Sequence, residues 1–295
     1  MSKGIKHLLI LGCGYVGERL AHACVTEGIK VTATTRSEAR ADELRTMGIN
    51  AVVADSPTSL SDELLSQCDA VLDSIPLTRD ESGMHASQLA WLPEIAPKLT
   101  GLKWAGHLST TGVYGDADGA WVDESWSCNP NSPRGSERLK AESAWLNSGL
   151  PTEVFRIAGI YGPGRNILSR LKAGGYQAVA WEPPHYSSRI HVDDIVAALM
   201  AAMCQPRAGR IVNLADDEPL PHGDYVVEVA KMIGAPAPEI LTPEAGERVL
   251  SSAMLDFFRD NKKVSNRLLH VELLETLKYP NFRDGIKALI SEEGE

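Results

Sequence analysis

The sequence predicts an α/β fold in which helices cover both faces of a doubly wound parallel sheet, with a smaller C-terminal lobe. Short apolar runs alternate with helical patterns that are long enough to serve as crossover helices between parallel strands. Gly28 and Gly48 stand just before the next apolar run, where helices are expected to end. The six expected strands cover residues 7–11, 30–34, 49–53, 70–73, 104–108 and 153–157.

The chain is expected to divide into two parts. After Tyr161 it becomes rich in glycine, proline and aromatic residues, and prolines separate the later helical segments. We expect residues 1–165, with 189–218 returning to them, to form the domain that contains the sheet. Residues 166–188 and 219–295 are expected to form the smaller lobe over the carboxyl ends of the strands, where ligands of open α/β sheets bind.

The charge balance favours a small-molecule partner. The 295 residues include 29 basic and 39 acidic side chains, a formal net charge of −10, which disfavours nucleic acid and anionic membranes as partners. A homodimer is compatible with the composition. The five cysteines are widely spaced without zinc-site spacing, and no apolar run is long enough to span a membrane, so we expect no metal and a cytoplasmic location.

A glycine-rich motif follows the first expected strand and opens the first helix. In "LLILGCGYVGERLA" the glycines have the spacing Gly-x-Gly-x-x-Gly, which allows a tight turn and a close approach to a dinucleotide pyrophosphate. The alternative is a turn that packs helix on sheet without a ligand. The expected cofactor contacts in this motif are Gly12, Cys13, Gly14, Tyr15, Val16 and Gly17.

The end of the second strand predicts which dinucleotide binds. An NAD-preferring site has a carboxylate about twenty residues after the glycines to bind the ribose 2′-hydroxyl, whereas this chain has Thr35 and Arg36 there. A guanidinium can form paired hydrogen bonds with a 2′-phosphate. We therefore expect NADP(H), with NAD(H) as the second choice. The alternative is that Arg36 is a solvated charge. Ile75 and Ser109, which follow the fourth and fifth strands, are also expected to contact the cofactor.

Several segments together resemble one family over almost the whole chain. They are "STTGVYGDADGAWVDESWSCNPNSPRGSERLKAE", "FRIAGIYGPGR" and "RIHVDDIVAAL", in addition to the glycine motif. The chain resembles the extended short-chain dehydrogenase/reductases, in particular their epimerase/dehydratase-like oxidoreductases. The resemblance implies a Rossmann fold, a nicotinamide cofactor and an adenine contact from Asp55, for which a turn or cap carboxylate is an equally good explanation.

The resemblance also locates the active-site positions and shows that two of them have changed. It places Thr110 where the family has a hydroxyl that binds and polarises the substrate oxygen. The family's catalytic tyrosine and lysine correspond to Arg134 and Arg138. Arginine remains protonated at any working pH, so Arg134 cannot exchange a proton with the substrate as tyrosine does.

Three alternatives follow from this exchange. A different phenol, Tyr161 or Tyr114, could supply the proton. Arg134 could instead stabilise the substrate oxyanion while water supplies the proton. In the third alternative the protein binds the dinucleotide without catalysis. We expect a pocket lined by Thr110, Tyr114, Arg134 and Tyr161.

Other positions constrain the reaction. Sugar-nucleotide dehydratases of the family have Asp-Glu where this chain has Thr111 and Gly112, which disfavours dehydration. His191, Asp193 and Asp194 precede an apolar helical pattern and are interpreted as a helix start instead of a metal site. The sequence therefore predicts an NADP(H)-binding oxidoreductase for a small carbonyl or alcohol, or an epimerase-like variant of it. A catalytically silent NADP(H) sensor is the alternative.

Overall fold

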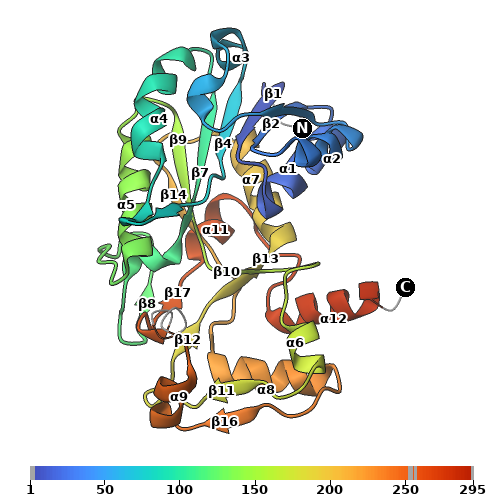
Figure 1. Cartoon of the computed structure of the whole chain (residues 1–295), viewed down its shortest axis with the longest axis vertical. Helices are drawn as coiled ribbons and strands as arrows, with labels where there is room; N and C mark the ends of the chain where they lie inside the picture. Colours follow the sequence, from blue (N-terminus) through green and yellow to red (C-terminus); the bar gives the residue numbers. More distant parts are fainter. Residues whose placement is uncertain (1–3, 252–254, 256–257, 294–295) are drawn as a thin grey trace.

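The molecule has an upper part built around a large sheet and a lower part of short strands and helices (Figure 1). The computed structural model describes residues 4–251, 255 and 258–293. Strand β9 (Thr152–Ile157) of the sheet leads directly into β10 (Gly159–Tyr161), which belongs to the lower part. The lower part therefore starts at the carboxyl end of β9. None of the helices within the described ranges is long and apolar enough to cross a membrane.

The central sheet has seven strands in the order β14-β9-β7-β4-β1-β2-β3, and every neighbouring pair is parallel. The strands are β1 (His7–Leu11), β2 (Lys30–Thr35), β3 (Asn50–Val53), β4 (Ala70–Asp73), β7 (Trp104–Thr110), β9 (Thr152–Ile157) and β14 (Ile211–Leu214). The chain runs outward from β1 to β3 on one side and from β4 to β14 on the other. This confirms the predicted doubly wound parallel sheet, whose order reverses between β1 and β4.

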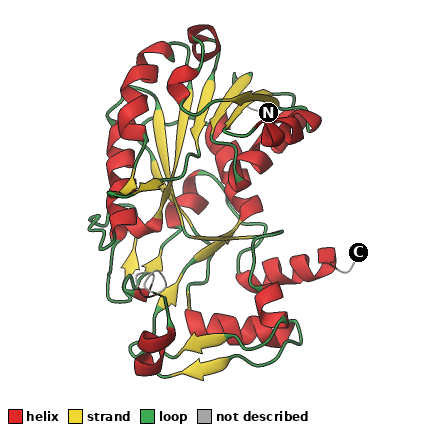
Figure 2. Cartoon of the chain, in the orientation of Figure 1, coloured by secondary structure: helices red, strands yellow, loops and turns green. Residues whose placement is uncertain are grey.

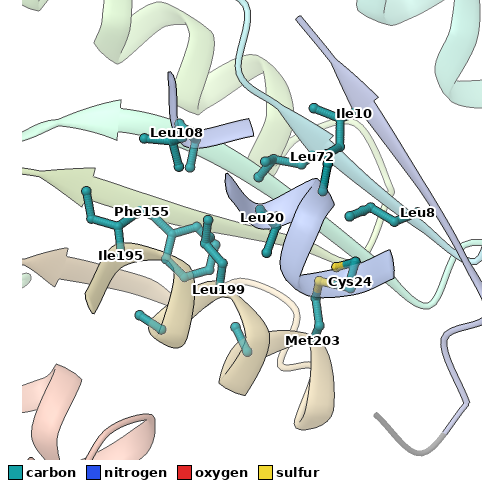
Figure 3. Close-up of a cluster of buried hydrophobic side chains, with 14 of the residues drawn as sticks. Leu8, Ile10, Leu20, Cys24, Leu72, Leu108, Phe155, Ile195, Leu199 and Met203 are labelled. Carbon is teal, nitrogen blue, oxygen red and sulfur yellow. The ribbon is translucent and has the colours of Figure 1, made fainter. Parts of the chain in front are cut away.

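Helices α1 and α7 cover one face of the sheet. Figure 3 shows Leu20 of α1 and Ile195 and Leu199 of α7 packed against Leu8 and Ile10 of β1, within one buried cluster. Successive strand residues point to opposite faces, so alternate residues of β1 serve this cluster. The helices of this face are α1 (Tyr15–Thr26), α2 (Glu38–Thr46) and α7 (Val192–Cys204).

The opposite face is covered by α4 and α5. Leu9 and Leu11, the other alternate residues of β1, lie in a second buried cluster with Trp91 of α4 and Trp145 of α5. Both faces of β1 are therefore buried, which explains its uninterrupted apolar sequence. The helices of this face are α3 (Asp62–Ser66), α4 (Gln88–Ile95) and α5 (Pro133–Leu146). A hairpin of β5 (Thr78–Asp80) and β6 (Gly83–His85) joins β4 to α4.

The edge strand β14 was not among the six strands expected from sequence. It pairs with β9 and is fixed by a buried ion pair in which the Arg210 guanidinium lies 2.6 Å from the Glu153 carboxylate. The backbone N–H of Asn213 also donates to Glu124 (2.8 Å). The run "IVNL" is too short to be assigned as a strand on its own pattern.

Short strand pairs and helices form the lower part and connect it to the sheet (Figure 2). The pairs are β10 (Gly159–Tyr161) with β13 (Arg189–His191), β11 (Gln177–Val179) with β16 (Glu239–Leu241), β12 (Tyr186–Ser187) with β15 (Leu220–Pro221), and β8 (Trp121–Val122) with β17 (Lys263–Val264). The helices are α6 (Leu168–Lys172), α8 (His222–Met232), α9 (Pro243–Val249), α11 (Arg267–Glu272) and α12 (Phe282–Glu293). The exact boundaries of the two expected domains remain predictions.

The start of α7 matches its interpretation from sequence. His191 is the N-cap residue, and its Nδ1 accepts a hydrogen bond from the backbone N–H of Asp193 (3.2 Å). Asp194 accepts from the backbone N–H groups of Lys278 and Tyr279 (2.6 and 3.1 Å). The Asp194 carboxylate therefore connects the start of α7 to the loop before α12. Within the part of the chain that the structure describes, no three metal-ligating side chains gather.

Candidate active site

The glycine loop lies between β1 and α1, beside the point where the strand order reverses. Gly12 has a φ of +79°, and a Cβ there would be 3.1 Å from the backbone N and Cα of Ile75. A Cβ on Gly17 would be 3.2 Å from the Ile10 side chain. The first glycine therefore allows the loop to contact the segment after β4, and the third allows α1 to pack closely on β1.

The N-terminus of α1 is open to a ligand. No side chain caps the helix at Gly14. Within the described residues, the backbone N–H groups of Tyr15 and Val16 have no hydrogen-bond partner. Unpaired N–H groups and the positive end of the helix dipole together make an anion site. The pyrophosphate contact at this position remains a prediction.

The Tyr15 side chain fastens the start of the lower part to α1. Its hydroxyl donates to the carbonyl oxygen of Pro163 (2.9 Å), and Arg19 donates to the same oxygen (3.3 Å) while its guanidinium lies 3.8 Å from the Tyr15 ring centre. A Cβ on Gly162 would be 2.7 Å from the Tyr15 hydroxyl. The loop 162–165 is therefore held over the first turn of α1.

The predicted contacts at the ends of β2 and β3 lie at the surface. β2 ends at Thr35, and the Arg36 side chain is exposed, with no ion-pair partner among the described residues. Asp55 is likewise exposed, beyond the end of β3. The side chains of Cys13 and Val16 are buried, so only their backbone can contact a cofactor. The roles of Arg36 and Asp55 remain predictions.

Arg40 is a cation near the glycine loop that the sequence reasoning missed. It forms an ion pair with Glu18 of α1. Burial raises the pKa of the Cys13 thiol to about 11, and the nearby Arg40 charge opposes that rise. The sequence gave no direct signal for Arg40, because Arg36 lies before the N-cap residue Ser37 and Arg40 lies within α2, so helix spacing does not relate the two.

A buried hydrogen-bond network positions Ile75. One oxygen of the Asp73 carboxylate accepts from the backbone N–H of Ile75 (3.0 Å). The other lies within hydrogen-bond distance of His107 Nδ1 (2.8 Å), Gln88 Nε2 (3.0 Å) and Trp145 Nε1 (2.8 Å). Asp73 thus connects the loop after β4 to β7, α4 and α5. Sequence spacing gave no signal for this network, because its members are far apart in the chain.

The Ser109 hydroxyl is occupied by an internal contact. It donates to the Glu142 carboxylate (2.5 Å), which also accepts from the Arg156 guanidinium (2.8 Å). All three are buried, and the Arg156 guanidinium lies 4.9 Å from the ring centre of Tyr114. The predicted cofactor contact of Ser109 therefore has only its backbone available in this arrangement.

Thr110 ends β7 at the edge where the loop after β4 also lies. Its Oγ1 accepts a hydrogen bond from the backbone N–H of Gly112 (3.1 Å), which leaves the hydroxyl hydrogen available for donation. The first turn of α5 contacts the same turn closely, because a Cβ on Gly135 would be 2.7 Å from the carbonyl oxygen of Gly112. Thr110 and the start of α5 are therefore neighbours, as predicted for a shared site.

Arg134 and Arg138 occupy the first two turns of α5. The Arg138 guanidinium donates to the carbonyl oxygens of Ile75 (3.3 Å) and Leu108 (3.4 Å), which places it between the loop after β4 and the end of β7. Burial lowers the pKa of Arg138. Arg134 is exposed and lies one helical turn closer to the N-terminus of α5.

The two candidate phenols are both buried. Tyr114 is fully buried, its hydroxyl donates to Asn213 (2.7 Å), and burial raises its pKa to about 12. Tyr161 is 5% exposed, and burial raises its pKa well above the usual range. A Cβ on Gly285 would be 2.3 Å from the Tyr161 hydroxyl, so that hydroxyl is covered by α12.

The expectation that Thr110, Tyr114, Arg134 and Tyr161 line one pocket is therefore corrected by the structure. The structure places Thr110 and Arg134 on neighbouring turns, but Tyr114 points to the sheet edge strand and Tyr161 lies in the core of the lower part. Burial of the two hydroxyls separates them from a substrate held at Thr110. The prediction of Tyr161 as a catalytic residue gains no support from this geometry.

A cavity of about 350 Å³ lies in the lower part of the molecule. Asp260, which follows one of its lining residues in the chain, accepts a hydrogen bond from the Asn131 side chain (3.4 Å). Asn131 precedes α5 by two residues. The lining residues are Trp181, Glu247, Leu255, Phe258 and Arg259.

Comparison with known proteins identifies the fold. The TrkA-N domain model matches residues 8–93, the part that contains β1 to β4 and the glycine loop. The structure of the human epimerase family protein SDR39U1 with NADPH is superposable with a TM-score of 0.76 at 16% identity, covering 97% of this chain and 99% of that chain. The chain therefore has the fold of these NAD(P)-binding, epimerase/dehydratase-like proteins.

Two relatives are closer in sequence. A functionally unknown conserved protein from Silicibacter pomeroyi DSS is 35% identical, with a TM-score of 0.87 over 97% of this chain and 99% of that chain. Protein YeeZ of Escherichia coli (strain K12) is 28% identical over 248 residues, which cover 80% of this chain and 86% of that protein.

Proposed function

We propose that this protein is an NADP(H)-dependent oxidoreductase that acts on a small carbonyl or alcohol. The observation that carries the proposal is the glycine loop at the reversal of strand order, with an uncapped helix N-terminus and unpaired N–H groups. These features suit the pyrophosphate of a dinucleotide. The NADPH in the structure of the human protein with the same fold supports the choice of cofactor class.

The residues that would hold the cofactor are already arranged around one edge of the sheet. The N–H groups at the start of α1 would bind the pyrophosphate, and Arg36 would bind the 2′-phosphate with Arg40 beside it. Ile75 would contact the dinucleotide from the loop after β4. Bound NADPH supplies a hydride.

The substrate carbonyl would lie near Thr110. The Thr110 hydroxyl can donate a hydrogen bond to the carbonyl oxygen, because it accepts from Gly112 and keeps its own hydrogen for this purpose. Arg134 would stabilise the negative charge that develops on that oxygen during hydride addition. Since Arg134 remains protonated, water would supply the proton that completes the alcohol.

A second candidate function is a non-catalytic NADP(H) sensor. The observation that favours it is that arginines replace the family's proton-transferring pair, while Tyr114 and Tyr161 are both buried. A sensor and an oxidoreductase share the cofactor site and differ in turnover. NADPH oxidation that depends on an added carbonyl compound would identify an oxidoreductase.

Cofactor choice provides the first test. Each charge-assisted hydrogen bond from Arg36 is worth about 1.5 to 3 kcal/mol, so NADPH should bind about ten- to a hundredfold more tightly than NADH. The substitution Arg36→Asp places a carboxylate beside the 2′-position, so the preference should move toward NADH. Fluorescence titration of both nucleotides against both proteins measures the change.

Arg267→Asp is the matched control, because it makes the same charge change at an exposed arginine at the start of α11. It should leave the nucleotide preference unchanged. Equal wild-type affinities for the two nucleotides would contradict the assignment of NADP(H). Failure to bind either nucleotide would contradict the proposed function itself.

A further inference from the structure

Arg134 and Arg138 form a pair of positive charges without an acidic partner. They are four residues apart on α5, so they lie on the same face of the helix. Within the described residues, neither has a carboxylate within ion-pair distance. Some arginines of the upper part do have one, since Arg40 pairs with Glu18 and Arg156 pairs with Glu142, whereas Arg36 has none in the described part of the chain. Two such cations one helical turn apart stand out in a chain with ten more acidic than basic residues.

The groups around this pair act in both directions. Burial lowers the pKa of Arg138 and the charge of Arg134 lowers it further, whereas the carboxylates of Asp73 and Glu142, both engaged elsewhere, oppose that effect. The Asp73 oxygens already accept hydrogen bonds from the loop after β4, α4, α5 and β7. The amino end of α5 adds the positive end of its dipole. The closest acidic residue in the sequence, Glu137, is engaged by Lys140 and the backbone of Ala86.

The exposed Arg134 side chain has hydrogen-bond donors to offer a ligand. Arg138 uses its Nη1 to hold two backbone carbonyl oxygens, whereas Arg134 makes no side-chain hydrogen bond within the described residues. A guanidinium presents two parallel N–H groups that match the two oxygens of a carboxylate. An anionic group at this place would also relieve the repulsion between the two arginines.

The location connects the charge pair to the reaction centre. The first turn of α5 touches the turn that begins at Thr110, through the close approach of Gly135 to Gly112. Arg138 reaches the end of β7 by its contact with the carbonyl oxygen of Leu108. A substrate with its reacting carbon at Thr110 would therefore place a neighbouring substituent at Arg134.

We infer that the substrate carries a carboxylate close to its reacting carbon, and that Arg134 binds this carboxylate while Arg138 adds a second positive charge. The inference rests on the proposed function, because it places the reacting carbon at Thr110. The positive charge that binds the carboxylate also lies next to the oxygen that becomes negative during reduction. This explains why an arginine can be of use where the family has a tyrosine.

The test compares carboxylates with their neutral amides. Calorimetric titration of the NADP⁺-saturated protein with acetate and acetamide, and with benzoate and benzamide, measures the contribution of charge at nearly constant shape. At least one carboxylate should bind about tenfold or more tightly than its amide, and the preference should weaken with salt. In Arg134→Gln the preference should fall to less than about threefold.

The control is Arg170→Ala, which removes an exposed arginine of α6 whose guanidinium lies over the Tyr176 ring. It should keep the full preference for carboxylate. NADPH affinity of Arg134→Gln, measured in the same series, should remain near the wild-type value, which shows that the variant is folded.

The outcomes separate this inference from the proposed function. Carboxylates that bind no better than their amides, or a preference that survives in Arg134→Gln, would overturn the inference while NADPH binding leaves the cofactor site intact. A wild-type protein that does not bind NADPH would instead overturn the proposed function.

Discussion

Glu142 is the residue at which the buried polar contacts beneath Thr110 converge. It accepts from Ser109 of β7 and from Arg156 of β9, and it is 1% exposed. Arg156 in turn lies over the ring of Tyr114. One side chain of α5 thus fixes the helix to two strands of the sheet. The buried positive charge of Arg156 is neutralised only while the Glu142 carboxylate is present.

Neutralising Glu142 should therefore destabilise the protein strongly. Glu142→Gln leaves the Arg156 charge buried without a partner, which should lower the free energy of unfolding by about 3 to 5 kcal/mol. Urea denaturation followed by circular dichroism measures the change. Glu43→Gln, which breaks an exposed ion pair with Arg40, is the control and should cost at most about 1 kcal/mol. Equal losses of unfolding free energy in the two variants would show that the buried ion pair contributes no more to stability than the exposed one.

Residues with local roles could be predicted from the sequence, and residues with distant partners could not. The spacing of Gly12 and Gly17 was sufficient because backbone geometry near a strand end requires glycine there. The resemblance placed Thr110 and Arg134 in one site, and in the structure the turn after Thr110 does contact the first turn of α5. Glu142 gave no such signal. Its importance depends on partners that only the folded sheet brings to it.

At the level of elements, the contact between α1 and the loop 162–165 links the two parts of the molecule. The loop follows β10, the first strand of the lower part, and rests on the first turn of the helix that is proposed to bind the pyrophosphate. The link consists of two donors, Tyr15 and Arg19, on a single carbonyl oxygen. Removing one donor tests how much of the loop's order depends on it.

Tyr15→Phe should loosen this loop without unfolding the sheet. A lost neutral hydrogen bond costs about 1 kcal/mol, so amide hydrogen exchange in residues 162–166 should become about fivefold faster. Exchange in β1 and β4 should not change. The matched control is Tyr186→Phe, because the hydroxyl of Tyr186 makes no hydrogen bond within the described residues. If exchange in the loop stays at the wild-type rate in Tyr15→Phe, then Arg19 alone holds the loop.

Sequence periodicity predicted the elements of the upper part far better than those of the lower part. Six of the seven strands of the sheet were expected within one or two residues of their ends, because fully buried parallel strands form uninterrupted apolar runs. In the lower part, strands of two or three residues pair across long sequence separations. Runs of two or three residues are too short to show a hydrophobic periodicity, so tertiary contacts determine how these strands pair.

At the scale of the whole molecule, the burial of His191 in its neutral form should make the free energy of unfolding depend on pH. His191 is 2% exposed, and burial lowers its pKa from 6.5 to about 4, against the opposing charge of Asp193. The unfolded chain binds a proton at higher pH than the folded chain does. The contribution of His191 is therefore present above about pH 6.5 and is lost as the pH falls toward 4.

Replacing this histidine should flatten that dependence. Asparagine can also cap a helix, so His191→Asn keeps the cap and removes the titration. Between pH 7 and pH 5 the wild-type protein should lose about 2 kcal/mol more unfolding free energy than the variant. Urea titrations of both proteins at the two pH values give this difference, which cancels the fixed cost of the smaller side chain. Parallel losses in both proteins would show that other groups dominate.

The position of β14 at the edge of the sheet has a consequence for synthesis on the ribosome. When the first 165 residues have emerged, six strands of the sheet are available, but β9 is still an open edge. Glu153 on that edge lacks Arg210, its partner in the finished protein. The nascent chain must therefore carry an unpaired strand and an uncompensated carboxylate until about fifty more residues follow. Chaperones that shield exposed strand edges would act in this interval, and truncation before β14 would leave a product prone to aggregation.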